Sequence, residues 1–305
     1  MKLKSCLMLG GAALVFLGVA LSQQPPAAPA AGAPGAAPGG RGGRGGGGFR
    51  QPDPIDFADN TGWTPMWDGS TFKEWDGDFA YWKIDNGAIV VESTCEKPTG
   101  TIYLIWKGGE AADFEMKLEM KGEGANVNSG VQYRGAITTP REGPGRAGGA
   151  AGAGGRGRGP QGPCPSGAAR GTSPSRESQA KWDMLGAQFD FDGKNRYSGQ
   201  YYEQATGRGI IAWRGQVVRT EEGKNPRLLA TLGNPDELAG YVKIEDWNQL
   251  HIIARGNTMT HIINGHVMSV LIDDDATKFR KNGLIGVEIE GTGKISLRNL
   301  WLKRL

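Results

Sequence analysis

Cysteine and histidine are scarce in this chain, with three of each among 305 residues. No Cys-x-x-Cys pair occurs, which excludes the zinc sites built on that spacing. The sequence also contains neither a glycine-rich phosphate-binding loop nor the residue order typical of a Ser-His-Asp catalytic triad. Cys6 precedes an apolar run instead of following one, which excludes a lipoprotein cysteine. Of the other two, Cys164 falls in a glycine-rich stretch; an oxidising compartment permits a disulfide with Cys95, and neither residue is assigned a function.

Long hydrophobic runs are absent apart from one at the start of the chain. Two lysines precede an apolar run from Cys6 to Leu21, which ends at small residues around Ser22. A membrane-spanning helix needs about 20 apolar residues, so the pattern favours a cleavable signal peptide over residues 1–22 rather than an anchor. We therefore expect a secreted or periplasmic protein without a transmembrane segment after cleavage.

Large side chains are missing from two stretches that are rich in Gly, Ala, Pro and Arg. Residues 23–54 are expected to form a disordered linker, and residues 136–180 a low-complexity insertion, because such composition cannot offset the entropy lost on ordering. The formal charge of the chain is +3, and the arginines of these two stretches account for its basic character. The remainder is acidic, so nucleic acid is not an expected partner.

Helical patterns are also lacking, and short strands with glycine-rich turns take their place. Residues 114–121 alternate strictly between apolar and charged, which predicts a strand with one buried face. Asn86-Gly87 and Asn264-Gly265 are typical hairpin tips. We predict an all-β fold, a two-sheet antiparallel sandwich or jelly roll, over residues 55–305 with the insertion inside it.

Two of the expected strands have one apolar and one polar face. Side chains alternate along a strand, so Val131 and Tyr133 should point to the core while Gln132 and Arg134 point away. In residues 185–192 the polar side chains are Gln188, Asp190 and Asp192. If both strands share a sheet, Gln132, Arg134, Gln188 and Asp190 line one open face. A guanidinium, amides and a carboxylate on such a face suit sugar hydroxyls and carbonyls.

The order of several short motifs resembles one family, the domain of unknown function 1080, also called the 3-keto-disaccharide hydrolase domain. The motifs are Trp67-Asp68-Gly69-Ser70, Asn128-Ser129-Gly130, Gln188 to Asp190, Trp247-Asn248, His261 to Gly265 and Arg298-Asn299. The resemblance implies a concanavalin-like jelly roll and a secreted protein acting on glycosides whose C3 hydroxyl has been oxidised to a ketone. The chain departs from the pattern at Gly186, where many relatives carry an acidic residue. It departs again at Glu288 and Glu290, where relatives often have Gln and His.

A ketone at C3 acidifies the C2 proton and allows the C1 substituent to leave. Such a reaction needs a base, a donor for the enolate oxygen and an acid for the leaving oxygen. Arg134 is a candidate for the enolate oxygen. The candidate acids and bases are Asp190, Glu119, His261, Glu288 and Glu290. The candidate sugar-binding residues are Asn128, Gln132, Gln188 and Trp247.

Each candidate has a simpler structural explanation. Arg134 and Asp190 are as consistent with an ion pair across neighbouring strands as with a reactive pair. Glu119 belongs to an alternating run typical of a solvated face, and Trp247 fits a core better than a sugar platform.

The resemblance implies a secreted hydrolase or lyase for 3-keto-glycosides, and a non-catalytic carbohydrate-binding module is the alternative. A two-carboxylate glycosidase mechanism also stays open. No cofactor is required by the sequence. A divalent metal is possible, although the run Asp273-Asp274-Asp275 better fits a solvated turn than a calcium site.

Overall fold

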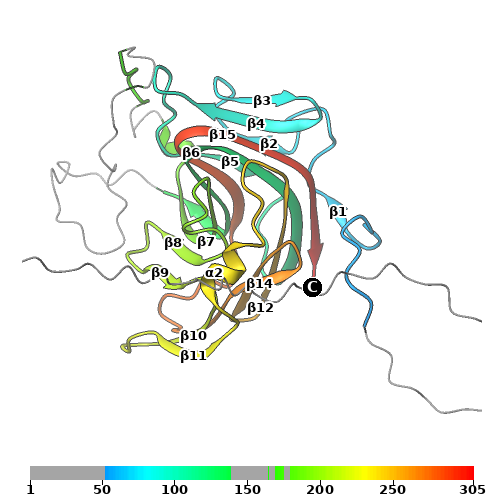
Figure 1. Cartoon of the computed structure of the whole chain (residues 1–305), viewed down its shortest axis with the longest axis vertical. Helices are drawn as coiled ribbons and strands as arrows, with labels where there is room; N and C mark the ends of the chain where they lie inside the picture. Colours follow the sequence, from blue (N-terminus) through cyan, green and yellow to red (C-terminus); the bar gives the residue numbers. More distant parts are fainter. Residues whose placement is uncertain (1–51, 139–163, 165–168, 175–178) are drawn as a thin grey trace, which may run out of the picture. The chain divides into compact units, whose positions relative to one another are not determined.

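The structure, a computed structural model, describes residues 52–138, 164, 169–174 and 179–305, and β-strands dominate it (Figure 1). The strands are β1 (Thr64–Pro65), β2 (Trp75–Asp76), β3 (Trp82–Asp85), β4 (Ala88–Ser93), β5 (Ile102–Trp106), β6 (Phe114–Ile137), β7 (Met184–Asp192), β8 (Tyr201–Gln204), β9 (Gly209–Ala212), β10 (Gln216–Glu221), β11 (Arg227–Thr231), β12 (Asn248–Arg255), β13 (Thr258–Ile263), β14 (His266–Asp274) and β15 (Leu284–Arg304). A 3-10 helix η1 (Ala180–Trp182) and a short helix α2 (Pro235–Ala239) are the helical elements among the described residues.

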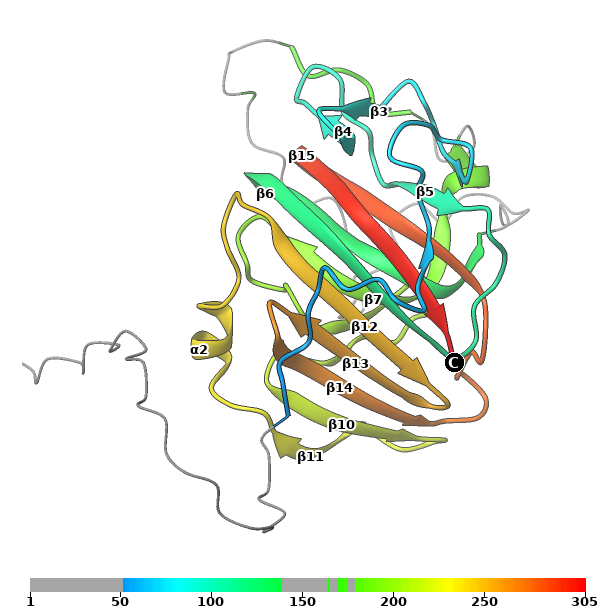
Figure 2. The same cartoon turned by 90° about the vertical axis from the view of Figure 1, so that its right-hand side faces the viewer.

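Two long strands, β6 and β15, lie side by side and run through both layers of the sandwich (Figure 2). The first half of β6 pairs with β12 and its second half pairs with β7. The first part of β15 pairs with β5 and the later part with β4. One layer therefore has the order β2-β5-β15-β6-β7-β8-β9, and the other has the order β3-β4-β15-β6-β12-β13-β14-β10-β11.

The predicted all-β jelly-roll sandwich is confirmed, with two refinements. The layers are not separate sheets, because β6 and β15 join them into one hydrogen-bonded sheet. The pairing is also not wholly antiparallel, since β10 runs parallel to β14.

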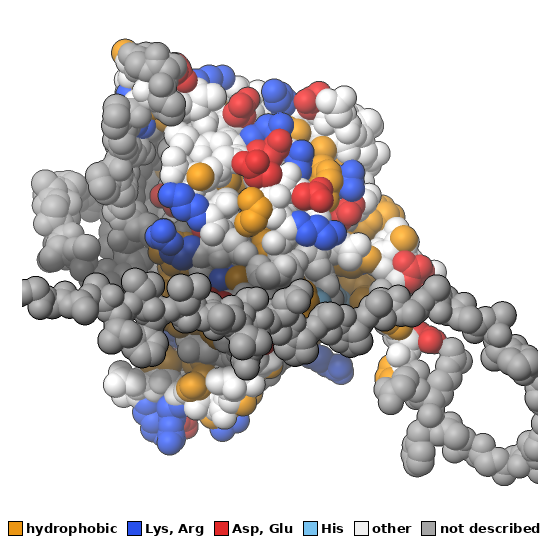
Figure 3. All heavy atoms as spheres, viewed as in Figure 1, with side chains coloured by type: hydrophobic (Ala, Val, Ile, Leu, Met, Phe, Trp, Pro, Cys, Tyr) orange, Lys and Arg blue, Asp and Glu red, His pale blue; other side chains and the backbone are white. Residues whose placement is uncertain are grey.

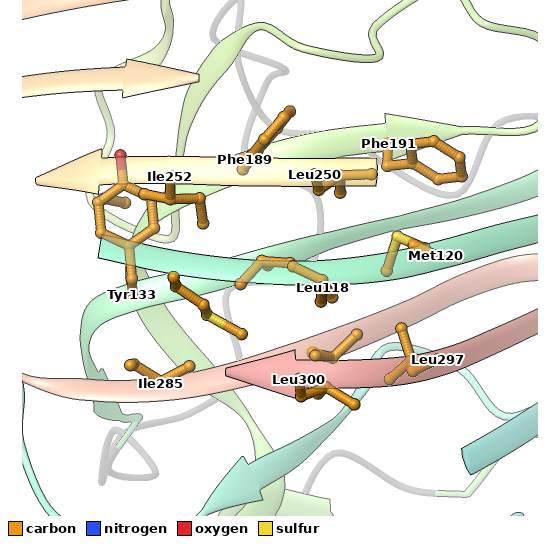
Figure 4. Packing of buried hydrophobic residues seen from close by; sticks show 14 of the residues in the cluster. Leu118, Met120, Tyr133, Phe189, Phe191, Leu250, Ile252, Ile285, Leu297 and Leu300 are labelled. Atoms are coloured by element: carbon orange, nitrogen blue, oxygen red, sulfur yellow. The ribbon is translucent and has the colours of Figure 1, made fainter. Parts of the chain in front are cut away.

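The core lies between the layers and is filled by the apolar positions of the alternating strands. Leu118 and Met120 of β6, Phe189 of β7 and Ile252 of β12 are all fully buried there (Figure 4). Because successive side chains alternate, the same strands present their polar residues on the outer side of each layer. The outer side of the layer containing β7 carries the predicted site residues Gln132, Gln188 and Asp190.

Within β6 the alternation is interrupted by a bulge at Arg134. The register with β7 shifts between Tyr133 and Ala136, and Arg134 has φ of 46°. The facing residue, Gly186, has φ of 127°, and a Cβ placed there would lie 2.9 Å from the Cα of Gly135. A glycine is required at position 186 for both reasons, which explains why no acidic residue stands there. An extra residue in one strand reverses the side to which the following side chains point.

A disulfide joins Cys95, after β4, to Cys164 in the predicted insertion. The N–H of Gly171 also donates to the carbonyl of Cys95. These described parts of the insertion are therefore fixed to the sandwich, which the prediction of a loose loop did not anticipate. Most of residues 136–180 lie outside the described residues, as do the predicted signal peptide 1–22 and nearly all of the linker 23–54.

Residues Asp53–Leu305 form a compact unit of their own. Among the described residues, no helix has the length and apolar character needed to span a bilayer.

Candidate active site

A patch of polar side chains occupies the outer side of the layer containing β5, β15, β6 and β7. We call it the polar face. The register places Glu288 of β15 opposite Tyr103 of β5 and opposite Gly130 of β6, and Gly130 in turn faces Asp190 of β7. The polar face is made by Tyr103, Asn128, Gln132, Gln188, Asp190, Gln200, Glu288 and Glu290.

Glu288 lies at the centre of the polar face and is 1% exposed. The hydroxyl of Tyr103 donates to its Oε1 at 2.9 Å, and the amide of Gln188 donates to its Oε2. Burial, reinforced by the neighbouring charges of Glu290 and Asp190, raises the pKa of Glu288 to about 8. These costs to the charged form outweigh the two hydrogen bonds that favour it. Glu288 is therefore a protonated acid at neutral pH.

Gly130 leaves the space through which Gln188 reaches Glu288. A Cβ at position 130 would lie 2.7 Å from Cγ of Gln188 and 2.7 Å from the carbonyl oxygen of Phe189. The lack of a side chain at this position is thus what allows three strands to contribute to one carboxyl site.

The polar face is deep at one end and open at the other. Trp182 of η1 packs beside Tyr103 together with Met184, and covers the deep end. At the opposite end Asn128 and Glu290 are half-buried, and the amide of Asn128 donates to Oε2 of Glu290 at 3.2 Å. Glu290 is therefore nearer to solvent than Glu288.

Glutamine side chains line the deep part of the polar face. Gln132 is fully buried, and neither of its amide atoms has a hydrogen-bond partner among the described residues. Gln200 donates from Nε2 to Oδ2 of Asp190 at 2.6 Å, while its Oε1 has no such partner in this part of the chain. These amides have the capacity to bind a polar ligand.

The expectation that Arg134 shares this face with Asp190 was wrong. The bulge turns its side chain to the other side of β6, where its guanidinium donates to the carbonyls of Ala112 and Gly256 and pairs with Asp113 at 3.1 Å. Phe279 lies 5.3 Å from the guanidinium carbon. Every guanidinium nitrogen is therefore engaged in holding loops, and Asp190 instead has Gln200 as its partner.

His261 likewise lies away from the polar face, in the core. Its ring stacks on Phe189 at 4.3 Å and accepts or donates a hydrogen bond with Tyr133 at 2.8 Å. Burial lowers the pKa of His261 to about 3, against smaller opposing effects of hydrogen bonds that the ring donates to the backbone of Gln200 and Gly199. It is a neutral core residue and is not placed to exchange protons with a ligand on the polar face.

Glu119 and Trp247 occupy the outer side of the other layer. Glu119 accepts from Arg298 at 2.9 Å and from Asn299, and the guanidinium of Arg298 lies 4.1 Å from the Trp247 ring centroid. Acidic and basic side chains are intermixed on the upper part of the surface in Figure 3. These two candidates form a partly buried network of their own, in which the Glu119 side chain is 15% exposed, and they are not brought together with Glu288.

Tyr103 and Gln200 were not among the sequence candidates. Tyr103 lies in the apolar run Ile102–Trp106, which indicates a strand buried on both sides. Gln200 follows a loop, so no alternation assigns it to a face. The sequence does contain a signal for each residue. Tyr103 is a hydrogen-bonding side chain within an apolar run, and Gln200 is one directly after a glycine.

Metal binding receives no positive support from this geometry. No group of three or more His, Cys, Asp or Glu side chains among the described residues is arranged to hold an ion.

A sequence profile of the family described as "3-keto-alpha-glucoside-1,2-lyase-like domain" matches residues 62–303. No curated protein matches the chain.

Among solved structures, a putative glycosyl hydrolase from Parabacteroides distasonis is similar with 13% identity and a TM-score of 0.44, covering 80% of this chain and 94% of that one. A carbohydrate-binding module, CBM66, from Bacillus subtilis is similar with 10% identity and a TM-score of 0.40, covering 74% of this chain and 93% of that one.

Proposed function

Because the chain belongs to the family of 3-keto-alpha-glucoside-1,2-lyase-like domains, we propose that it cleaves the glycosidic bond of 3-keto-glycosides on the polar face. The observation that carries the proposal is the pair of carboxyl groups on β15: Glu288 is buried and protonated, while Glu290 is half-buried beside it. Two like groups in different environments are suited to act as acid and base.

The proposed reaction begins at C2 of the oxidised sugar. Glu290 removes the C2 proton, and the electron pair of that bond is delocalised into the C3 carbonyl. The pair then forms the C1–C2 double bond as the C1–O bond breaks, and Glu288 gives its proton to the departing oxygen. Addition of water at C1 would complete a hydrolysis; without it the protein is a lyase.

The remaining residues of the polar face position these groups. Tyr103 and Gln188 hold the Glu288 carboxyl from both sides, which fixes the direction of its proton. Nε2 of Gln132 has no hydrogen-bond partner among the described residues, and we assign it to donate to the C3 oxygen on which negative charge develops, the role first expected of Arg134.

The proposal is tested by comparing a 3-keto-disaccharide with its unoxidised parent and following the released sugar by NMR in D2O. We expect turnover of the keto form alone, with deuterium incorporated at C2 when proton removal is reversible. Accumulation of the unsaturated sugar would identify a lyase, and its absence a hydrolase. Binding without turnover would instead support the carbohydrate-binding module, and cleavage of the unoxidised parent would contradict the ketone-dependent chemistry.

We also propose that the protein acts outside the cytoplasm. The disulfide between Cys95 and Cys164 supports this location, because such bonds persist in oxidising compartments. Cell fractionation with an antibody tests it, and recovery of the protein in the cytoplasmic fraction with both cysteines reduced would contradict it.

A further inference from the structure

A pair of aromatic rings lies beside the open end of the polar face. Trp213, in the turn after β9, is 47% exposed. Its ring centroid lies 6.4 Å from that of Tyr197, a half-buried residue in the loop between β7 and β8. A single exposed aromatic residue needs no explanation, but aromatic rings side by side next to a candidate site are typical of ligand-binding surfaces.

The hydrogen-bonded row of strands fixes how far this pair lies from the proposed base. Glu290 of β15 pairs with Asn128 of β6, and Asn128 pairs with Asp192 of β7. The backbone N–H of Tyr197 donates to Oδ1 of Asp192 at 2.7 Å. Because adjacent strands lie about 4.8 Å apart, the loop that carries Tyr197 begins about 10 Å from the backbone of Glu290. This separation suits the second ring of a disaccharide whose first ring lies at Glu290.

Hydrogen bonds fix the turn that carries Trp213. The N–H of Trp213 donates to Oε1 of Gln216 at 3.0 Å, and the N–H of Gln216 donates to the carbonyl of Trp213 at 3.1 Å. Between them, Arg214 donates to the side-chain oxygen of Asn195 at 2.8 Å and to its carbonyl at 2.9 Å. Asn195 belongs to the same loop as Tyr197, so the two rings are held in place before any ligand binds. Little entropy is then lost when a ligand packs on them.

The chemistry of this surface fits a pyranose ring. One face of such a ring consists of C–H groups, which pack on an aromatic ring, while its edge carries hydroxyl groups. The guanidinium carbon of Arg196 lies 5.7 Å from the Tyr197 ring centroid, and the paired N–H groups of a guanidinium suit two neighbouring hydroxyls. Two aromatic rings are too small a surface for a stable protein interface, which buries at least about 1,000 Å².

We propose that Trp213 and Tyr197 form a platform on which the leaving sugar of a 3-keto-disaccharide stacks. This rests on the proposed function, in which the oxidised ring lies at Glu290 and the second sugar departs from its C1. It adds a specificity determinant that binds the leaving group and takes no part in proton transfer. Because Trp213 is exposed, a ring stacked on it needs no cavity among the buried side chains around Glu288.

Steady-state kinetics with two oxidised substrates test the platform. One is a 3-keto-disaccharide, and the other is methyl 3-keto-glucoside, whose leaving group is too small to reach Trp213. In Trp213→Ala the KM for the disaccharide should rise by at least about tenfold while kcat stays within about twofold of wild type, because the lost binding is shared by the ground and transition states. The kcat/KM for the methyl glycoside should be unchanged, which also verifies that the site is intact in the variant.

Two further variants serve as controls. Trp213→Phe keeps an aromatic face and should retain most of the affinity for the disaccharide. Phe79→Ala removes another exposed ring, which lies before β3 and 4.7 Å from the ring of Phe72, and should affect neither substrate. An unchanged KM for the disaccharide in Trp213→Ala, or equal losses with both substrates, would overturn the platform and leave the proposed function standing.

Calorimetry on the wild-type protein and Trp213→Ala separates the platform from the proposed function. If the wild-type protein cleaves neither substrate, the proposed function fails, and the intact 3-keto-disaccharide becomes the ligand. Binding that is at least about tenfold weaker in Trp213→Ala would then retain the platform as a sugar-binding surface. Equal binding to both proteins, or no binding to either, would overturn it.

Discussion

Glu288 is the residue whose surroundings most constrain its chemistry. It combines near-complete burial with two neutral hydrogen-bond donors and two neighbouring acids. Burial and like charges both penalise ionisation, and the donors only partly offset this. The same surroundings that make it an acid at neutral pH make the folded state bind a proton that the unfolded state releases.

This residue should therefore give stability a characteristic pH dependence. The pKa of Glu288 is raised in the folded state from 4.5 to about 8. Between these values the native state holds more protons than the unfolded state, so its contribution is fully present below pH 4.5 and is lost as pH rises toward 8. Urea unfolding at pH 5 and pH 8 measures it. We expect the decrease in unfolding free energy between these pH values to be larger, by a few kcal/mol, in wild type than in Glu288→Gln. Equal decreases in the two proteins would show that Glu288 ionises normally.

Gly130 offers a second prediction at this scale. In Gly130→Ala the new methyl group meets both Gln188 and the carbonyl of Phe189 at 2.7 Å. Overpacking of this kind costs about 1–3 kcal/mol, and it displaces Gln188 from Glu288. Chemical denaturation should show that loss together with reduced turnover. The control Gly265→Ala, at a hairpin tip where a Cβ meets nothing within 4 Å, should lose stability from its backbone strain alone and keep its turnover. Normal turnover in Gly130→Ala would mean that the contact between Gln188 and Glu288 is dispensable.

At the scale of elements, the second half of β6 shows where the alternation of apolar and polar residues predicts the side of a strand correctly and where it does not. The pattern correctly assigned Val131 and Tyr133 to the core and Gln132 to the polar face. It failed one position later because a bulge is set by backbone packing between strands. The tight approach of Gly135 to Gly186 is a contact between distant segments, and no local pattern contains it. Arg134 was consequently placed on the wrong face.

The bulge reverses what is expected of Arg134→Ala. Loss of the guanidinium leaves the carbonyls of Ala112 and Gly256 and part of Asp113 without partners, which should lower the unfolding free energy by about 3 kcal/mol. Turnover by the protein that stays folded should be close to wild type. The control Arg219→Ala, on an exposed pair with Asp274, should cost less than about 1 kcal/mol. A stable Arg134→Ala protein without activity would restore the arginine to the mechanism.

At the scale of the whole molecule, the sandwich follows from local patterns but the site does not. Hairpin tips and alternating strands are local features, and they were sufficient to predict an all-β jelly roll. The site needs Glu288, Gly130 and Tyr103 side by side. Glu288 and Tyr103 are 185 positions apart in the sequence. That arrangement depends on β15 lying between β5 and β6, which is a matter of long-range register.

The disulfide also acts on the whole molecule, since it closes a loop of 69 residues between Cys95 and Cys164. Cross-linking a loop of this length restricts the unfolded chain and typically contributes about 2–4 kcal/mol. Cys164→Ser should lower the unfolding free energy by this amount, measured by urea denaturation without reductant. Added dithiothreitol should bring wild type to the same value and leave the variant unchanged. A wild-type protein indifferent to the reductant would show that the bond contributes nothing.

The central claim is that the polar face around Glu288 carries out the chemistry, and one comparison of variants tests it most directly. The rate at which a 3-keto-disaccharide is cleaved should be measured for wild type, Glu288→Gln and Glu119→Gln at pH 7, with folding of each verified by thermal melting. A positioned general acid contributes about 10²–10⁴-fold, so Glu288→Gln should lose at least a hundredfold in kcat. Glu119→Gln, in the other layer, should stay within about twofold of wild type by the same reasoning. A fully active Glu288→Gln protein, or a folded but inactive Glu119→Gln protein, would contradict the account.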